Sequence, residues 1–249
     1  MATALILCTL IVAAVFGLWA TRRWALKSPQ FALRTVTFSG LSRVGDVELR
    51  RVAAIGPGQN LFQLDLSGLE RALATHPWVK SARVTRRWPN AISVHVEERK
   101  AAALASLGEL YLVDEGGEPF KRIDVEDAVD LPLITGMTRE EYVAAPADGA
   151  GRLRDAISLV ERYEKRGRGK LSEVRLGPVG AVVVAEDGLE IHLGERDVNE
   201  QLARLDRVQQ ELSRRSLGAA VIRLDDRERP GRAAVKLAAA SPVATSAPQ

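Results

Sequence analysis

The chain has 249 residues, of which 46% are hydrophobic, so it is long enough for one large domain or two small domains with real cores. Its 35 basic and 32 acidic residues leave a formal net charge of +3, which is weak support for any polyanionic partner. The single cysteine, Cys8, excludes an intrachain disulfide and a cysteine-based zinc site.

The N-terminal segment predicts a membrane span. Residues 2–20 carry no charge and lead directly into the basic sequence TRRWALK. Nineteen helical residues at 1.5 Å each cover about 28 Å, close to the ~30 Å hydrocarbon core of a bilayer. A cleaved signal peptide is the alternative, but no basic region precedes the apolar run, and LWA is a poor cleavage site. We therefore expect an anchor with a minimal tail over residues 1–22 and a juxtamembrane linker over residues 23–33.

The charges that follow the span bear on its orientation. The positive-inside rule would keep Arg22, Arg23 and Lys27 in the cytoplasm, together with the domains that follow. Translocation of a long domain can override this rule, and a start codon further upstream would add a basic cytoplasmic tail. Either explanation is needed if the following domains lie outside the cytoplasm.

Residues 34–98 predict a compact α+β unit. A strand over residues 34–38 is followed by a helix with Asp46 as its N-cap, and Ser67 and Glu70 form an S-x-x-E capping box for a second helix. Pro77 is expected to end that helix. Two alternating segments, WVKSARVTRRW and AISVHVEER, then make a hairpin. The order strand, helix, helix, strand, strand predicts a three-stranded sheet with both helices on one face.

A second unit is expected over residues 101–237. Short strands surround Gly108 and the DEGGE turn, and RLRDAISLVERYEKRG predicts a helix that ends at Gly167. The inward face of this helix is expected to hold Leu153, Ile157, Val160 and Tyr163. Three strand candidates, a helix behind Asp197 and a terminal hairpin complete an antiparallel-rich, mixed α+β domain with flanking helices, whose last strand is expected at a sheet edge. Residues 238–249 are small and uncharged, and they predict a disordered tail.

Residues that could carry catalysis are scattered. His76, His95 and His192 lie in three different predicted elements, with no histidine or cysteine at metal-ligand spacing. The acids of DEGGE would repel phosphate, so this loop is interpreted as a tight turn rather than an anion site. We therefore expect no catalytic residue, no metal and no cofactor.

The segment THPWVKSARVTRRWPN is basic and aromatic, which first suggests a nucleic-acid patch. Its charges divide between two strand faces, with Lys80 and Arg86 on one face and Arg83 and Arg87 on the other. Trp78 and Trp88 stand at opposite ends of the strand, where aromatic side chains commonly close a small core, whereas RNA-binding sheets stack bases on central aromatics. The segment is therefore interpreted as a fold element, without a nucleic-acid partner.

The order of several motifs resembles a known family. They are VTFSGLSRV, NLFQLDLSGLERAL, HPWVKSARVTRRWPNAISVHVEER, LYLVDEGGEPF, LPLITG and VGAVVVAEDGLEIHLGERD. In this order, the motifs resemble the bacterial FtsQ family of cell-division proteins, called DivIB in Gram-positive organisms. The resemblance implies one inner-membrane helix, a POTRA domain over residues 34–100 and an FtsQ-type β domain over residues 101–237, both in the periplasm.

The resemblance also implies a role and partners. Members act as non-enzymatic scaffolds that gather FtsB and FtsL at the division septum and so control septal peptidoglycan synthesis by FtsW and its transpeptidase partner. FtsB adds a strand to the free edge of the last β-domain strand. Carried onto this chain, the partner-binding residues are Arg223, Leu224, Asp225, Asp226, Arg232, Ala233, Ala234, Val235 and Lys236. Recruitment through the POTRA domain is implied for Arg86, Arg87 and Trp88.

The chain departs from the family pattern near its end. Many relatives carry an aromatic residue just after a Leu-Arg pair, where this chain has Leu224-Asp225-Asp226, and its RERPG turn is longer.

Two other classes of protein stay open. A POTRA-bearing envelope transport or assembly component would usually continue into a membrane barrel with alternating lipid-facing segments. A tethered peptidoglycan hydrolase would need an acid pair or a metal set.

Overall fold

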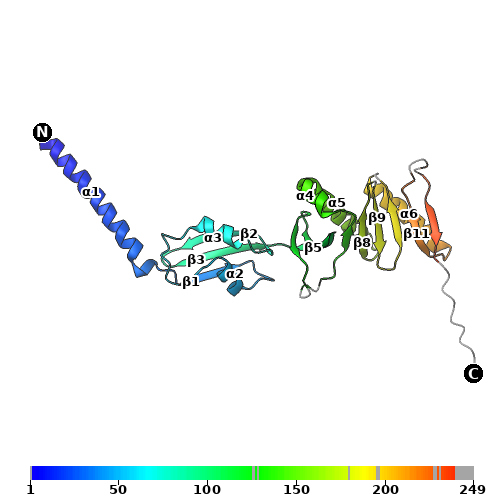
Figure 1. The fold of residues 1–249 in the computed structure, drawn as a ribbon, viewed down its shortest axis with the longest axis horizontal. Helices are drawn as coiled ribbons and strands as arrows, with labels where there is room; N and C mark the ends of the chain where they lie inside the picture. The colour runs from blue at the N-terminus through cyan, green and yellow to red at the C-terminus, as the bar shows by residue number, and fades with distance from the viewer. Residues whose placement is uncertain are drawn as a thin grey trace, which may run out of the picture. The chain divides into compact units, whose positions relative to one another are not determined.

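The structure is a computed structural model that describes residues 2–124, 127, 129–178, 180–194, 197–226, 229 and 231–238 (Figure 1). The chain divides into two compact units between Arg99 and Lys100. The predicted disordered tail lies outside the described residues except for Ala238, and so does most of the RERPG turn.

The N-terminal helix, α1, spans Ala2–Lys27 and therefore continues five residues past the predicted anchor, into the stretch expected to be a linker. Residues Ile6–Lys27 are long and apolar enough to cross a membrane, and their most apolar window is 0% buried. A helix of a soluble protein would bury its apolar side, so this exposure fits a lipid-facing segment. A short 3-10 turn, η1 (Pro29–Phe31), follows.

The first unit has the predicted order of elements. These are β1 (Thr35–Ser39), α2 (Asp46–Val52), α3 (Leu66–Leu73), β2 (Val79–Arg87) and β3 (Ala91–Glu98). Among the described residues they form a three-stranded sheet in the order β1-β3-β2, with β1 parallel and β2 antiparallel to β3. The predicted POTRA-like arrangement is therefore present.

Both helix starts differ from the prediction. The N-cap of α2 is Gly45 rather than Asp46, and α3 begins after Asp65 without a side-chain cap. The expected capping box is absent because α3 already begins at Leu66, so Ser67 lies inside the helix and is not its N-cap. The Glu70 carboxylate instead accepts a hydrogen bond from the backbone N–H of Val84 in β2, at 2.8 Å. Glu70 thus ties the helix to the sheet instead of closing its own first turn.

The second unit contains one large mixed sheet. Its described strands are β4 (Ala101–Leu107), β5 (Glu109–Asp114), β6 (Pro119–Arg122), β7 (Leu133–Thr135), β8 (Leu171–Leu176), β9 (Ala181–Ala185), β10 (Glu190–Leu193), β11 (Ala219–Arg223) and β12 (Ala234–Leu237). Their order is β12-β11-β10-β9-β8-β7-β4-β5-β6. The interior strand β7 was not predicted, and it pairs in parallel with both β4 and β8.

Helices cover one face of this sheet. The long helices are α5 (Pro146–Glu164) and α6 (Val198–Arg214), and a short helix, α4 (Arg139–Ala144), precedes α5. Both long helices contribute to a single apolar core with the strands, and Figure 1 shows α5 beside β8 and α6 beside β9 and β11. The four predicted core residues of α5 are all buried. Asp197 caps α6, as predicted, by accepting from Asn199 and Glu200 N–H at 2.8 and 3.1 Å.

The last three strands place β12 at an edge. Helix α6 connects β10 to β11, which run parallel, and β12 then folds back antiparallel to β11. In the described part of the chain β12 is the end of the sheet order, as the sequence predicted.

Candidate protein-binding interface

The edge strand β12 begins at Ala234, two residues later than predicted, so Arg232 and Ala233 precede it. Its register pairs Arg223 with Ala234 and Ile222 with Val235. A bulge on the β11 side, between Ala219 and Val221, bends the hairpin and leaves β12 itself continuous.

The direction of the β12 backbone can be derived from one hydrogen bond. The N–H of Ala238 donates to the Gly218 carbonyl at 2.9 Å, toward β11. Backbone groups of successive strand residues point to opposite sides, so the N–H groups of Lys236 and Ala234 also point toward β11. The N–H and C=O groups of Val235 and Leu237 therefore point away from the sheet, as at any open edge.

The side chains of β12 divide between two faces. Val235 packs against the core under the helices, whereas Ala234 and Lys236 are exposed on the helix-free face. Leu237 is 47% exposed. An added strand would thus meet a small residue, a cation and one apolar side chain.

Charged residues of β10 and β11 adjoin this edge on the helix-free face. The Arg223 guanidinium donates to Asp225 at 3.1 Å, and His192 lies 2.6 Å from Glu190 and 4.0 Å from Asp225. The hydrogen bond and charge of Arg223 hold the pKa of the Asp225 carboxyl below its ordinary value. The predicted partner-binding residues did not include Glu190 and His192, because only the parallel pairing of β10 with β11 brings these two beside Arg223.

The remaining residues predicted to bind a partner have structural contacts. Leu224 is only 3% exposed, and its N–H donates to the His192 carbonyl at 2.9 Å. Asp226 accepts from the N–H of Arg229 at 2.9 Å. The Arg232 carbonyl accepts from the Arg204 side chain of α6 at 2.9 Å. Leu224 thus supports the edge from the core, while Asp226 and Arg232 each have a contact within the described part of the chain.

The proposed recruitment residues of the first unit differ from one another. Arg86 donates to the carbonyls of Leu61 and Leu64 at 2.8 and 2.7 Å and is half-buried, whereas Arg87 is exposed. Trp78 is 9% exposed, as predicted for a core aromatic, but Trp88 is 54% exposed. The prediction that Trp88 closes a small core is therefore wrong, because this side chain is exposed at the turn between β2 and β3.

The histidines and the DEGGE turn have local partners. His76 lies 3.0 Å from Glu48, and His95 lies 3.1 Å from the Ser39 hydroxyl. In the turn, Asp114 accepts from the N–H groups of Gly116 and Glu118 at 2.9 and 3.0 Å, so its donors are used within the turn itself. Among the described residues, no three histidine, cysteine or acidic side chains are grouped to hold a metal ion.

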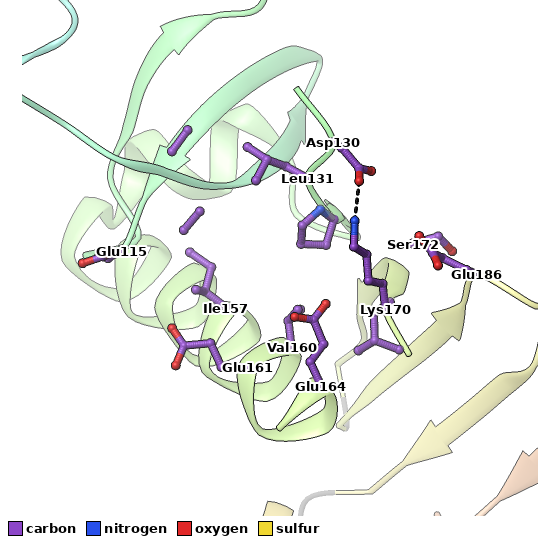
Figure 2. Close-up of a pocket in the computed structure, with 14 residues that line it drawn as sticks. Glu115, Asp130, Leu131, Ile157, Val160, Glu161, Glu164, Lys170, Ser172 and Glu186 are labelled. Atoms are coloured by element: carbon purple, nitrogen blue, oxygen red, sulfur yellow. Dashed lines mark hydrogen bonds and ion pairs between the residues drawn. The ribbon is translucent and has the colours of Figure 1, made fainter. Parts of the chain in front are cut away.

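The second unit also has an acidic hollow of about 400 Å³ beside α5. Figure 2 shows Glu161 and Glu164 on α5 facing it, with Lys170 reaching across to Asp130. The hydrogen bond that Lys170 donates to Asp130 raises the pKa of Lys170, the one cation among the lining residues that the structure describes. The hollow therefore repels anions, and its lysine is already engaged.

Fold and edge together define a class: a protein with a membrane-type helix, a POTRA-like unit and a mixed sheet that ends in an open strand. Residues 31–99 match the family model of the FtsQ-type POTRA domain, and residues 102–227 match that of the FtsQ/DivIB C-terminal region. The chain belongs to the FtsQ/DivIB family of cell-division proteins. Strand β12 lies beyond the last matched residue.

Relatives agree with this assignment. The chain is similar to the cell division protein FtsQ of Myxococcus fulvus, with 50% identity over 226 residues, which is 90% of this chain and 80% of the relative. It is 40% identical over 243 residues to the cell division protein FtsQ of an Anaeromyxobacter species, covering 95% of this chain and 83% of the relative. A Geobacter cell division protein FtsQ is 29% identical over 202 residues, or 79% and 74% of the two chains.

Proposed function

We propose that this chain is a non-enzymatic scaffold of the bacterial division machinery that binds FtsB through the free edge of β12 and gathers FtsL with it. In this proposal α1 is a single anchor in the inner membrane, both units lie in the periplasm, and the protein is enriched at the septum. The scaffold links early and late division proteins and controls septal peptidoglycan synthesis by FtsW and its transpeptidase partner.

The open backbone of β12 is the observation that carries the proposal. Val235 and Leu237 direct their N–H and C=O groups outward, and a partner strand can pair with them without any change in the sheet. Backbone hydrogen bonds of this kind give affinity but little selectivity. We assign selectivity to the neighbouring side chains of Lys236, Leu237 and Arg223, because they are exposed beside the edge.

Paired substitutions at Val235 test the edge. Val235→Pro removes an outward donor while the inward donors of Ala234 and Lys236 remain, and Val235→Ala trims the side chain but keeps the donor. Co-purification with FtsB and FtsL from detergent-solubilised membranes is expected to fail for Val235→Pro and to persist for Val235→Ala. Hydrogen exchange of the β11 amides verifies that both variants keep the sheet. Full FtsB capture by a folded Val235→Pro chain would exclude strand addition at β12.

The orientation needs its own experiment, because Arg22, Arg23 and Lys27 follow the apolar run and oppose it. A reporter that is active only in the periplasm, fused after Gln249, is expected to be active. A reporter that is active only in the cytoplasm serves as the matched control and is expected to be silent. The reverse pattern would overturn the proposed topology and with it the proposed site of FtsB binding.

A further inference from the structure

Four aromatic rings form a continuous cluster where α1 meets the first unit. We define the aromatic cluster as Trp24, Phe31, Phe62 and Trp88. The ring centroids of Trp24 and Phe31 lie 6.1 Å apart, and Phe31 lies 4.9 Å from Phe62 and 6.1 Å from Trp88. Phe62 and Trp88 are 4.7 Å apart. The cluster therefore joins the end of the apolar helix to the β2–β3 turn.

The aromatic cluster is exposed. Trp24, Phe62 and Trp88 have 59%, 45% and 54% of their surface accessible. At the opposite end of β2, Trp78 is buried, so the unit can cover an aromatic side chain where one belongs to its core. A contiguous exposed apolar patch on a folded unit is typical of a surface that contacts a partner or a lipid.

The position of Trp24 along α1 fixes the level at which the aromatic cluster begins. The apolar run ends at Ala20, and Trp24 lies four residues further, or about 6 Å at 1.5 Å per residue. The headgroup layer on each side of the hydrocarbon core is roughly 5–8 Å thick. Trp24 therefore falls within this layer, where tryptophan is enriched in membrane proteins.

The first unit is fastened at the same level. The Asn60 side-chain amide donates to the carbonyls of Ala25 and Leu26 at 3.0 and 2.9 Å. These carbonyls belong to the last turn of α1, which has no further helical N–H to bind them. Phe62 is two residues from Asn60, and the Leu61 N–H donates to the Phe31 carbonyl at 2.8 Å. The contacts keep the aromatic cluster against the end of the helix.

The charges around the helix end suit a phospholipid surface. A hollow of about 310 Å³ beside the aromatic cluster is lined by Trp19, Arg22, Arg23, Leu26, Lys27 and Gln63. This lining contains three cations and no acid, and Arg23 lies over the Trp19 ring at 5.2 Å. Arginine and lysine at a helix end extend toward lipid phosphates, so charge and apolar surface favour the same ligand.

We propose that the aromatic cluster is a lipid-contact surface, which seats the first unit in the phospholipid headgroup layer at the point where α1 leaves the bilayer. The occupant of the patch is the membrane that already surrounds α1. This inference goes beyond the proposed scaffold function, and it holds for either orientation of the chain and without FtsB. Its consequence is that the first unit is held at a fixed height rather than hanging from a flexible linker.

Depth-dependent fluorescence quenching of the full chain in vesicles tests the proposal. Three single-cysteine chains carry an environment-sensitive dye, in vesicles of phosphatidylethanolamine and phosphatidylglycerol with spin labels either in the headgroup or deep in the acyl chain. The native chain is labelled at Cys8, which is exposed on α1. The other two combine Cys8→Ser with Phe62→Cys or with Val47→Cys.

Val47 is a matched control because it is an apolar residue of the same unit that is 65% exposed. It lies in the first turn of α2, just after residues 42–44, whose N–H groups bind Glu98 at the end of β3. Trp88 lies near the start of β3 instead, and eight strand residues separate the two ends by roughly 26 Å. A dye at residue 47 should therefore stay in water.

Headgroup spin labels are expected to quench the dye at residue 62 at least about threefold more than the dye at residue 47. The dye at Cys8 should be quenched mainly by the deep label, which verifies that α1 is inserted. Equal, weak quenching at residues 62 and 47 with an inserted Cys8 would overturn the lipid-contact proposal and leave the scaffold function untouched. Quenching or dye shielding at residue 62 that rises with the protein-to-lipid ratio would assign the patch to a second copy of the chain and also overturn it.

Discussion

Val235 of β12 stands opposite Ile222 of β11, so its side chain packs on the core while its own N–H points away from the sheet. One residue therefore both holds the last hairpin in place and offers a donor to a partner. Variants of this strand can lose binding through lost packing or through a lost donor.

Leu224→Ala is expected to destabilise the second unit by about 2–5 kcal/mol, because a leucine that is 3% exposed leaves a cavity when truncated. Leu237→Ala should cost under about 1 kcal/mol, since that side chain is 47% exposed. Thermal unfolding of the detergent-solubilised chain measures both. Equal losses of stability would contradict the burial of Leu224. If FtsB binding falls in both variants, only Leu237→Ala reports on the interface.

Arg86→Gln is expected to destabilise the first unit by about 2 kcal/mol, because the Leu61 and Leu64 carbonyls lose charged donors. The neighbouring Arg87→Gln should be close to neutral, since Arg87 is exposed. Denaturant-dependent hydrogen exchange of the β3 amides provides the measurement. Septal localisation can then be assessed in the stable Arg87 variant, and a destabilised Arg87→Gln chain would contradict this assignment.

Glu98→Gln is expected to cost about 1–3 kcal/mol at neutral pH. The Glu98 carboxylate accepts from the backbone N–H groups of Ser42, Arg43 and Val44 at 2.9, 2.9 and 3.1 Å. Glu97→Gln is the matched control, because Glu97 forms an exposed pair with Lys80, and such pairs contribute little. Hydrogen exchange of β1 and β3 compares the two variants with the original chain.

The pH dependence of the Glu98 effect has a definite sign. Burial raises the pKa of the Glu98 carboxyl, but the N–H groups of Ser42, Val44 and Arg43 outweigh it and hold the pKa below its ordinary value of 4.5. The stability from this lowered pKa is present above pH 4.5 and is lost as the pH falls through the folded-state pKa. The original chain and Glu98→Gln should therefore converge in acid, and a gap that persists there would refute the role of the charge.

Gly117→Ala is expected to be far more harmful than Gly108→Ala. Both glycines have left-handed backbones, with φ of +81° and +79°, and an alanine costs about 1–2 kcal/mol there for this reason alone. A Cβ on Gly117 would also lie 2.0 Å from the Ala150 carbonyl of α5, whereas nothing lies within 4 Å at Gly108. Melting temperatures of the two variants decide the matter, and similar values would show that α5 yields without cost.

The sequence predicted most elements because their patterns are local. Alternation found β2 and β3, the three strand candidates that follow α5 coincide with β8, β9 and β10, and the stripe ending at Tyr163 found α5. The S-x-x-E pattern predicted a capping box of Ser67 with Glu70, although the box that forms is Thr138 with Glu141, which caps the unpredicted helix α4. Helix α3 begins before Ser67, and Glu70 accepts a hydrogen bond from the Val84 N–H of β2, a tertiary contact that no local pattern indicates.

The candidate site was only partly visible in the sequence for the same reason. The edge position of β12 follows from its place at the end of the chain order, but the burial of Leu224 and the approach of His192 to Asp225 depend on the parallel pairing of β10 with β11. Trp88 was predicted to be buried but is exposed. An aromatic side chain at the end of a strand can face the core or the solvent with the same alternation of residues. Long-range pairing supplies this information, and residue spacing does not.

Residue-resolved amide exchange in the complex with FtsB tests strand addition at β12 most directly. Exchange of the outward N–H groups of Val235 and Leu237 is expected to slow at least about tenfold on binding, which is about 1.4 kcal/mol of added protection. The inward N–H of Lys236, already directed to β11, should change much less. A complex that forms while Val235 and Leu237 exchange as fast as in the free chain would contradict the proposed interface.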